Sequence, residues 1–277
     1  MTFALSTNWN NRRLATGEAI VDEALALGFD ALELGFRTTP EQVPGFKARL
    51  DEMPVGSIHA FCPVPLSAPQ GHPELYQLAA FDDAARALAR VHVRKNVEFA
   101  AEMGADAVVL HAGRVACSTL FKRSRLKKRR RAGQRLVDVF KKELELLVPV
   151  LEANKVSLGL ENLPYLEGFP DEEELASLVG DWVRPWFDAG HDFVRKANGW
   201  IAGDGTPADK TLVAPLGLHL HDSLGGDDHL APGEGKIDFA ALAPLARAAR
   251  HRVLEPNGRV PAESLRKGLL HLRKLFA

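Results

Sequence analysis

Short apolar runs of this chain end, one after another, in a histidine or a carboxylate. Six strand-like segments share this feature, and their ligand-type residues are His59, His111, Glu161, Asp188 with His191, His219 with His221, and Glu255. The loop after the fifth segment adds Asp227 and His229. In a barrel of parallel strands, the C-terminal ends of all strands open on the face where active sites are built. The recurrence therefore predicts strand ends that converge on one site.

Strand-like and helix-periodic stretches alternate along the whole chain. We expect strands near residues 3–8, 30–36, 54–60, 106–112, 156–162, 183–189, 217–222 and 252–256. Amphipathic helices are expected near residues 17–28, 40–52, 79–103, 134–153, 171–180, 191–199, 238–250 and 261–275. The chain has 277 residues, and about 250 residues is typical of a closed (β/α)8 barrel. We therefore predict the α/β class and a single (β/α)8 TIM-barrel domain over residues 1–277.

The loops favour this barrel over an open doubly wound sheet. Such a sheet usually carries a glycine-rich phosphate loop after its first strand, whereas the first loop here reads STNWNNRR. Several loops at the expected C-terminal face are long and rich in Gly, Pro and His, while loops at the other end, such as 27–30 and 103–106, are minimal. This asymmetry indicates that the C-terminal face carries the function.

Composition excludes several classes of protein. A net charge of −1 does not suggest a protein that coats nucleic acid, and the N-terminal sequence MTFALSTNWNNRR lacks the apolar core of a signal peptide. No stretch approaches the roughly 18 apolar residues of a membrane span. Two cysteines, Cys62 and Cys117, make no disulfide framework. We expect a cytoplasmic enzyme with no membrane partner; association into a homo-oligomer stays open.

The residues at the strand ends are of the types that bind divalent metal ions. Imidazole nitrogens and carboxylate oxygens are ligands for zinc and similar ions, with three to five ligands to each ion. A single histidine at a strand end is more often a structural residue, but a cluster of histidines and carboxylates would be poorly satisfied without a cation. We therefore predict one to three divalent ions per chain, zinc or manganese. The candidate ligands are His59, His111, Glu161, Asp188, His191, His219, Asp227, His229 and Glu255.

The order of these motifs (His, HxG, LEN, DxGH, HLHD, DxH, GEG and Glu) resembles the xylose isomerase-like TIM-barrel superfamily. The resemblance runs from the second expected strand to the eighth. The superfamily includes sugar-phosphate isomerases and epimerases and the endonuclease IV type of AP endonuclease, known as AP endonuclease family 2. The resemblance is specific for the superfamily and not for the substrate.

Resemblance to the isomerases and epimerases implies one ion, often manganese. It would be held at four strand ends by Glu161, Asp188, His219 and Glu255. The ion would bind the carbonyl and hydroxyl oxygens of a sugar or sugar phosphate and stabilise an enediolate. Glu161 and Glu255 would move protons on and off carbon, and His191 would help to hold a substrate oxygen.

Resemblance to endonuclease IV implies three zinc ions and hydrolysis of a phosphodiester, with nucleic acid as the partner. The sets would be His59, His111 and Glu161; then Glu161, Asp188, His219 and Glu255; and then His191, Asp227 and His229. All nine positions are occupied here. The stretches LSTNWNN, ALELGFR and LENLPYLEGFPDEEEL nevertheless look more like the isomerase and epimerase members, so we favour sugar chemistry and keep the nuclease as the alternative.

A few further residues are candidates for substrate binding or structure. We expect Arg37 and Trp9 at the mouth of the barrel, and Glu33 either in the site or in a polar layer of the interior. Strand alternation puts His221 on the same face as His219, as a substrate contact or a packed neighbour. The basic segment from Lys122 to Arg135 is expected to be a solvated helix start, with phosphate binding as the alternative.

Overall fold

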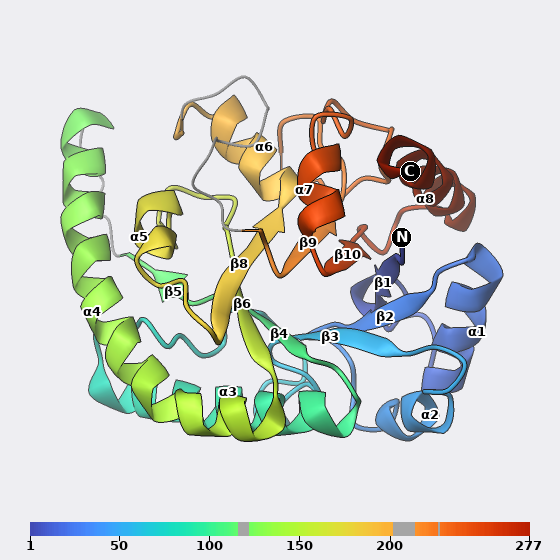
Figure 1. Cartoon of the computed structure of the whole chain (residues 1–277), viewed down its shortest axis with the longest axis horizontal. Helices are drawn as coiled ribbons and strands as arrows, with labels where there is room; N and C mark the ends of the chain where they lie inside the picture. The colour runs from blue at the N-terminus through green and yellow to red at the C-terminus, as the bar shows by residue number, and fades with distance from the viewer. Residues whose placement is uncertain (116–121, 202–213, 227) are drawn as a thin grey trace.

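The computed structural model describes residues 1–115, 122–201, 214–226 and 228–277, and the side chains of 122–128 are left out. Eight parallel strands of these residues form a closed barrel in the order β1-β10-β9-β8-β6-β4-β3-β2. The strands are β1 (Ala4–Ser6), β2 (Ala31–Leu34), β3 (Val55–His59), β4 (Ala107–Leu110), β6 (Ser157–Glu161), β8 (Val183–Asp188), β9 (Gly217–Leu220) and β10 (His251–Leu254). The predicted (β/α)8 TIM barrel is confirmed (Figure 1).

Each barrel strand is followed by a helix, as the alternation predicts. The helices are α1 (Gly17–Leu27), α2 (Val43–Ala48), α3 (Asp83–Glu102), α4 (Lys122–Asn154), α5 (Glu172–Ala176), α6 (Ala189–Ala197), α7 (Ala243–Ala248) and α8 (Ala262–Phe276). Gly28 and Gly104 follow α1 and α3 with φ of 87° and 76°, where a side chain would be strained. Helices α2, α5 and α7 are shorter than expected, because turns replace part of the helical pattern.

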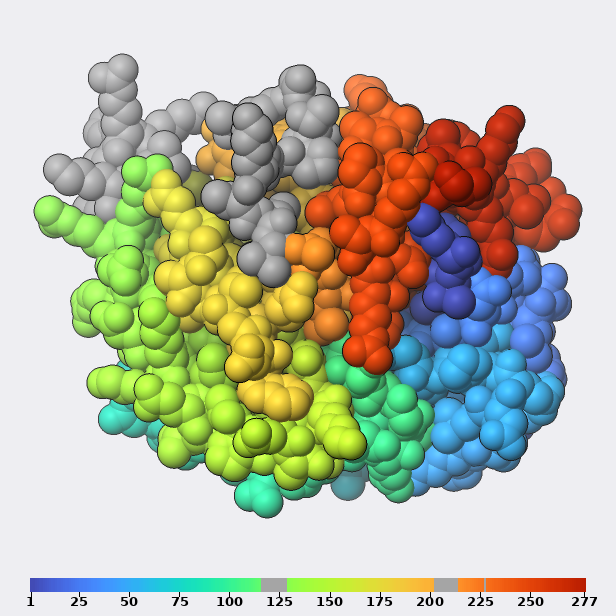
Figure 2. All heavy atoms as spheres, viewed as in Figure 1, coloured from blue at the N-terminus to red at the C-terminus, as the bar shows by residue number. Residues whose placement is uncertain are grey.

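The barrel closes between its first and last strands. Ala4 and Leu5 of β1 pair with Val253 and Leu254 of β10, while the other edge of β1 pairs with β2. Phe3 packs against Phe276 of α8, with ring centroids 6.3 Å apart. In Figure 2 the C-terminal residues, in red, accordingly lie beside the N-terminal residues, in blue. This closure brings residues of the first loop next to residues that follow β10.

Helix α4 begins at Lys122, so the basic segment starts this helix, as expected, and the amphipathic stretch near 134–153 continues it. Arg129 in this basic segment is not solvated: it is 4% exposed and donates to Glu174 at 2.9 Å and to the carbonyl of Leu166 at 3.2 Å. It ties α4 to the segment that contains β7 (Gly168–Phe169), which pairs antiparallel with β5 (Gly113–Arg114). The expectation of an exposed basic run is therefore wrong for Arg129, whose charge is neutralised inside the fold.

The interior of the barrel is packed at the N-terminal side of the strands. Trp186 of β8 is 1% exposed and contacts Ala107, Val109 and Val253 in a small apolar cluster. A Cβ atom on Gly217 would lie 2.4 Å from the Trp186 ring, so that glycine makes room for the indole. Apolar side chains thus fill the barrel at the N-terminal side of its strands, and the polar residues lie at the C-terminal side.

Among the described residues, no helix combines the length and the apolar character that crossing a membrane requires.

Candidate metal centre

The strand ends bring the predicted ligands together. His59, Glu161 and Asp188 are the last residues of β3, β6 and β8, while His111 and Glu255 follow β4 and β10 by one residue. All five are at most 7% exposed. Groups of residues whose ligand atoms lie within 4.8 Å of one another are His59, His111 and Glu161; His59, His219 and Glu255; Glu161, Asp188, His219 and Glu255; and His191, His221 and His229.

Glu161 is shared between the first and the second predicted ligand sets. Its Oε2 lies 3.1 Å from Nε2 of His59 and 3.0 Å from Nε2 of His111. Its Oε1 lies 3.0 Å from Nδ1 of His219. The side chain is completely buried, so its charge has to be balanced within the site.

His219 faces more carboxylates than its protons can satisfy. Its Nε2 lies 3.1 Å from Oε1 of Glu33, a carboxylate that also accepts a hydrogen bond from Ser57. Its Nδ1 lies 3.0 Å from Glu161, 3.3 Å from Glu255 and 3.7 Å from Asp188. When Nε2–H donates to Glu33, the lone pair of Nδ1 points at three carboxylates. A cation at that point satisfies all four groups, and a carboxylate behind a histidine is the usual support of such a ligand.

Backbone carbonyls fix the protonation of three further histidines. A carbonyl oxygen only accepts, so the ring nitrogen that faces it carries the hydrogen. The Nδ1 pairs are His59 with the carbonyl of Ala60 (3.1 Å), His191 with that of Asn162 (2.9 Å) and His229 with that of Glu255 (2.9 Å). In the neutral ring, Nε2 then keeps its lone pair. The three rings are therefore prepared as ligands in the way that protein metal sites prepare them.

The third cluster differs from the predicted one. The structure groups His191 and His229 with His221, whereas Asp227 lies outside the described residues. His221 stacks on His229 with centroids 3.7 Å apart, and its Nε2 lies 3.0 Å from Asp188. A Cβ atom on Gly190 would lie 1.9 Å from the His221 ring, so only glycine fits there. His221, expected as a substrate contact or a packed neighbour, packs on His229 and lies among the candidate ligands.

The loop after β9 is held by Asp222, whose side chain points away from the cluster as strand alternation predicts. Its carboxylate accepts from the backbone N–H groups of Gly233 (2.9 Å), Gly235 (2.8 Å) and Ile237 (3.0 Å). His229 in this loop has a φ of 47°, which is uncommon for a residue with a Cβ atom. The loop is thus fixed in the conformation that presents the His229 ring to the site.

The ionisable groups of the cluster strongly shift one another's pKa values. Burial alone would lower the pKa of His111, but Glu161 and Glu74 raise it to about 9. Burial would likewise lower the pKa of His219, but Glu255, Glu33 and Glu161 raise it well above its usual range. Burial opposes the ionisation of Glu161, while the histidines hold its pKa well below its usual range. Without a cation, protons have to occupy the positions between these groups.

The donor set fits a divalent ion. Two ligand atoms at about 2.1 Å from one zinc ion lie roughly 3.0 to 3.4 Å apart, depending on the coordination angle. The separations of 3.0 Å and 3.3 Å from His219 to Glu161 and Glu255, and of 3.1 Å from His59 to Glu161, are of this size. Imidazole and carboxylate groups together are a set that zinc and manganese accept. Glu161, Asp188, His219 and Glu255 would hold one ion, and the other two clusters offer ligands for more.

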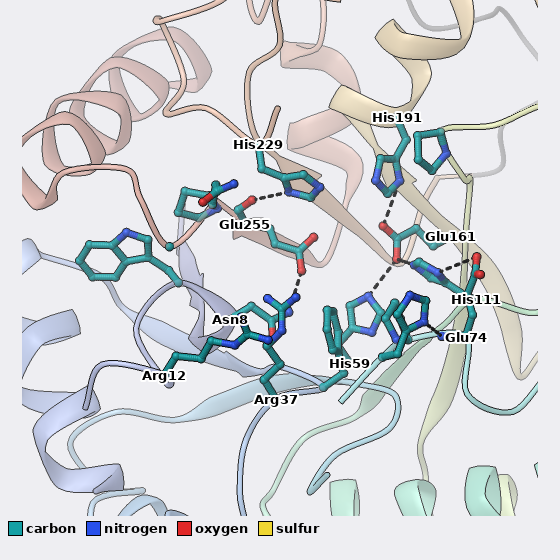
Figure 3. A pocket seen from close by; sticks show the side chains of 18 of the residues that line it. Asn8, Arg12, Arg37, His59, Glu74, His111, Glu161, His191, His229 and Glu255 are labelled. Carbon is teal, nitrogen blue, oxygen red and sulfur yellow. Dashed lines mark hydrogen bonds and ion pairs between the residues drawn. The ribbon is translucent and has the colours of Figure 1, made fainter. Parts of the chain in front are cut away.

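The cluster opens into a cavity of about 750 Å³. Figure 3 shows Glu161 between His59, His111 and His191, and Glu255 beside Asn8 and His229. Arg37 and Trp9 line the cavity, and Trp9 also belongs to the core: it is 4% exposed and its Nε1 donates to the carbonyl of Val260 at 2.9 Å.

Sequence reasoning missed three residues that orient the cluster and its surroundings. Asn8 donates to Oε1 of Glu255 at 3.1 Å, and Glu74 lies 3.7 Å from Nδ1 of His111. Arg12 lines the same cavity on the side of Asn8 (Figure 3). Asn8 and Arg12 lie in the STNWNNRR loop that was used to exclude a phosphate loop, and its asparagines were a signal for the site. Glu74 lies in a long loop with no pattern that could have identified it.

Solved structures share this fold over their full length. A D-tagatose 3-epimerase-like protein is 21% identical, with a TM-score of 0.71 and coverage of 100% of both chains. A Thermus thermophilus protein soaked with ZnCl2 is 24% identical, with a TM-score of 0.64 and coverage of 99% of this chain and 96% of the other. Endonuclease IV from Thermus thermophilus is 21% identical, with a TM-score of 0.61 and coverage of 99% of this chain and 98% of the other.

No protein of established annotation matches the sequence. The family of the xylose isomerase-like TIM barrel matches residues 21–275, which is nearly the whole chain and includes every candidate ligand. The resemblance carried by the order of the strand-end motifs is thereby confirmed. The chain belongs to the xylose isomerase-like TIM-barrel family.

Proposed function

We propose that this protein is a metal-dependent isomerase or epimerase of a small sugar. The observation that carries the proposal is the position of two carboxylates. Of the four residues that would hold one ion, Glu161 and Glu255 line the cavity, while Asp188 and His219 lie behind them. An ion bound there would polarise the carbonyl of a ketose. The two glutamates are then the groups of the set that can reach a carbon of the substrate.

The chain's own residues prepare both glutamates as bases. Burial would raise the pKa of Glu255, but the charges of His219 and His59 hold it below its usual range. Glu255 is oriented by the hydrogen bond from Asn8, and Glu161 by its three histidine contacts. In their ionised form, one carboxylate removes the proton from the carbon next to the carbonyl. The glutamate that took this proton can return it to the neighbouring carbon. The other glutamate serves the opposite side of the substrate and gives a proton there only after solvent has protonated it.

The shape of the cavity supports a small substrate. Small-molecule sites usually measure about 300–1,000 Å³, and this cavity measures about 750 Å³. Phe36 and Tyr165 contribute aromatic surface to its wall. Such surface suits the C–H faces of a sugar. The D-tagatose 3-epimerase-like structure adds support from a protein of the same fold.

Phosphodiester hydrolysis at abasic DNA is the second candidate. Two features favour it: His59 and His111 converge on Glu161, and a separate group of three histidines lies beside Asp188. A site for one ion does not require either of them. The basic start of α4 adds little, since Arg129 is buried against Glu174.

Hydrogen exchange separates the two candidates. The protein loaded with manganese or zinc is incubated in D2O with a panel of ketoses, and deuterium at the carbon next to the carbonyl is measured. We expect incorporation with at least one ketose and none with Glu255→Gln. The same preparation is tested on a duplex with one abasic site. Cleavage of this duplex that is lost in Glu161→Gln, without exchange into any ketose, would establish the nuclease instead.

A further inference from the structure

Five arginines line the cavity above the metal centre: Arg12, Arg13, Arg37, Arg114 and Arg259. Two of them are neutralised by carboxylates of the wall. Arg13 pairs with Glu23 at 2.8 Å, and Nε of Arg114 donates to Glu74 at 2.6 Å. The charges of Arg13 and Arg114 are therefore compensated within the protein. Of the other three, Arg259 is exposed to solvent, whereas Arg12 and Arg37 lie together (Figure 3).

Arg12 and Arg37 have no ion pair with any carboxylate in the part of the chain that the structure describes. Arg37 is half-buried, and its guanidinium lies over the Phe36 ring, 4.9 Å from the centroid. Its Nε is buried without a hydrogen-bond partner among the described atoms. Burial and the nearby charge of Arg12 both lower the pKa of Arg37. Figure 3 shows the two side chains converging beside Asn8.

The carboxylates of the metal centre do not neutralise Arg12 and Arg37. The charge of Glu255 acts to raise the pKa of Arg37, but Oε1 of Glu255 accepts from Asn8 at 3.1 Å and its Oε2 faces His219 at 3.3 Å. Arg12 is exposed, but half-buried Arg37 lies close enough to feel its like charge, and the buried Nε of Arg37 without a partner adds to the cost. An anion between them relieves both. Arginine is the side chain best suited to bind the oxygens of a phosphate or carboxylate with two N–H groups.

We propose that Arg12 and Arg37 bind an oxyanion group of the substrate, a phosphate ester or a carboxylate. The substrate is then an anionic sugar that spans the cavity. Its carbonyl end lies between Glu161 and Glu255, and its anionic end lies against the two arginines. The sugar part rests on the proposed function, whereas the oxyanion site rests on the arginines alone. Neutral sugars lack the group that this side of the cavity is built to hold.

Binding of inorganic phosphate tests the oxyanion site without any turnover. Isothermal titration calorimetry of the zinc-loaded full-length protein measures the affinity for phosphate in the wild type, Arg12→Gln, Arg37→Gln and Arg13→Gln. Arg13 is the matched control, because it carries the same charge on the same wall but is paired with Glu23. We expect at least a fivefold loss in Arg12→Gln and in Arg37→Gln, and less than a twofold change in Arg13→Gln.

Zinc content and the unfolding temperature of each variant show that the fold and the metal centre are retained. Equal phosphate affinity in all four proteins would mean that the ion alone binds phosphate, and this would overturn the proposal. The absence of phosphate binding in the wild type would overturn it as well. A variant that fails to load zinc is replaced by Arg37→Lys, for which we expect a smaller loss than for Arg37→Gln.

Sugars then identify the anion. D-Fructose 6-phosphate, D-gluconate and D-fructose are titrated into the same proteins. Tighter binding of the phosphate ester or of the sugar acid than of D-fructose supports the proposal, and the better of the two ligands names the anion. Equal binding of all three would overturn it, as would arginine-dependent binding of abasic DNA alone. If phosphate binding depends on the arginines but no ketose exchanges its proton, the oxyanion site stands and the proposed isomerase function fails.

Discussion

The ionisable residues at the two ends of strand β10 differ in whether nearby groups satisfy their charges and lone pairs. His251 at the start of the strand donates to Asp106 at 2.8 Å and stacks on Trp186, with centroids 5.8 Å apart. Burial would raise the pKa of Asp106, but His251 and Arg250 keep it below its usual range. Here each charge has partners that satisfy it. At the other end, Glu255 meets a cluster in which lone pairs and carboxylates face one another.

This difference shows how to distinguish a structural histidine from a candidate ligand. At the N-terminal end of the barrel, one carboxylate serves one imidazole and the arrangement is complete. At the C-terminal end, His219 has a carboxylate behind it and three in front of it. The second arrangement needs a cation, and the first does not. The residue types are the same, so the number of acceptors around each ring decides.

The largest expected effect is on kcat, and it distinguishes substitutions at the two ends of β10. Glu255→Gln keeps the hydrogen-bonding shape but removes the base, so kcat for exchange should fall by about 10²–10⁴-fold. His251→Gln at the other end should leave kcat within about threefold while lowering the unfolding temperature, because it weakens a partly buried pair. Steady-state kinetics and thermal unfolding of both variants measure this. A large loss of kcat in His251→Gln and none in Glu255→Gln would reverse the assignment of the two ends.

The next largest effect is on zinc affinity, and it distinguishes the carboxylate that supports His219 from the one that supports His251. Glu33 supports His219 at 3.1 Å, as Asp106 supports His251 at 2.8 Å. Loss of a supporting carboxylate usually weakens metal affinity by about 10–100-fold. Zinc titration against a chelating indicator should show this loss for Glu33→Gln and no change for Asp106→Asn. Unchanged zinc affinity in Glu33→Gln would mean that His219 is not a ligand.

The smallest effect, counted per unit of pH, is that of pH on ion affinity. In the ion-free protein the pKa of His111 is raised to about 9, so an ion has to displace its proton below that pH. Ion affinity should therefore rise with pH by up to about tenfold per unit and level off near pH 9. The same group affects the stability of the ion-free protein in the opposite direction. Its contribution is complete below about pH 6.5 and is lost as the pH rises through 9.

Calorimetry in buffers of different ionisation enthalpy counts the protons released when the ion binds. We expect proton release at pH 7 and little at pH 10. An ion affinity that does not change between pH 6 and pH 9 would contradict a role for these histidines as ligands.

The sequence predicts the barrel well because each strand is a short apolar run with a polar end. All eight barrel strands lie within or at one residue of their expected ranges. The segment from Lys122 to Arg135 was expected to begin a helix, as it does, but its run of charge gave no sign that one of its arginines is buried. Buried pairing of Arg129 with Glu174 depends on a contact between distant segments, which no local pattern reveals.

The site shows the same limit. Ligand candidates at strand ends could be predicted, since parallel strands place their ends together. The support of His219 by Glu33 could not, because β2 and β9 are not neighbours in the barrel and meet only across its interior. Strand alternation left His221 as a substrate contact or a packed neighbour, and its stacking on His229 could not be predicted because it depends on the folded loop after β9. The pairing of each arginine likewise depends on the folded loops.

Metal analysis of the purified protein tests the central claim most directly. The protein is loaded with zinc or manganese, dialysed against metal-free buffer and analysed by mass spectrometry, together with His219→Ala and His251→Ala. We expect at least one ion per chain in the wild type and in His251→Ala, and a loss of at least one ion per chain in His219→Ala. A wild-type protein that retains no divalent ion, or equal ion content in all three proteins, would contradict a metal centre at the C-terminal end of the barrel.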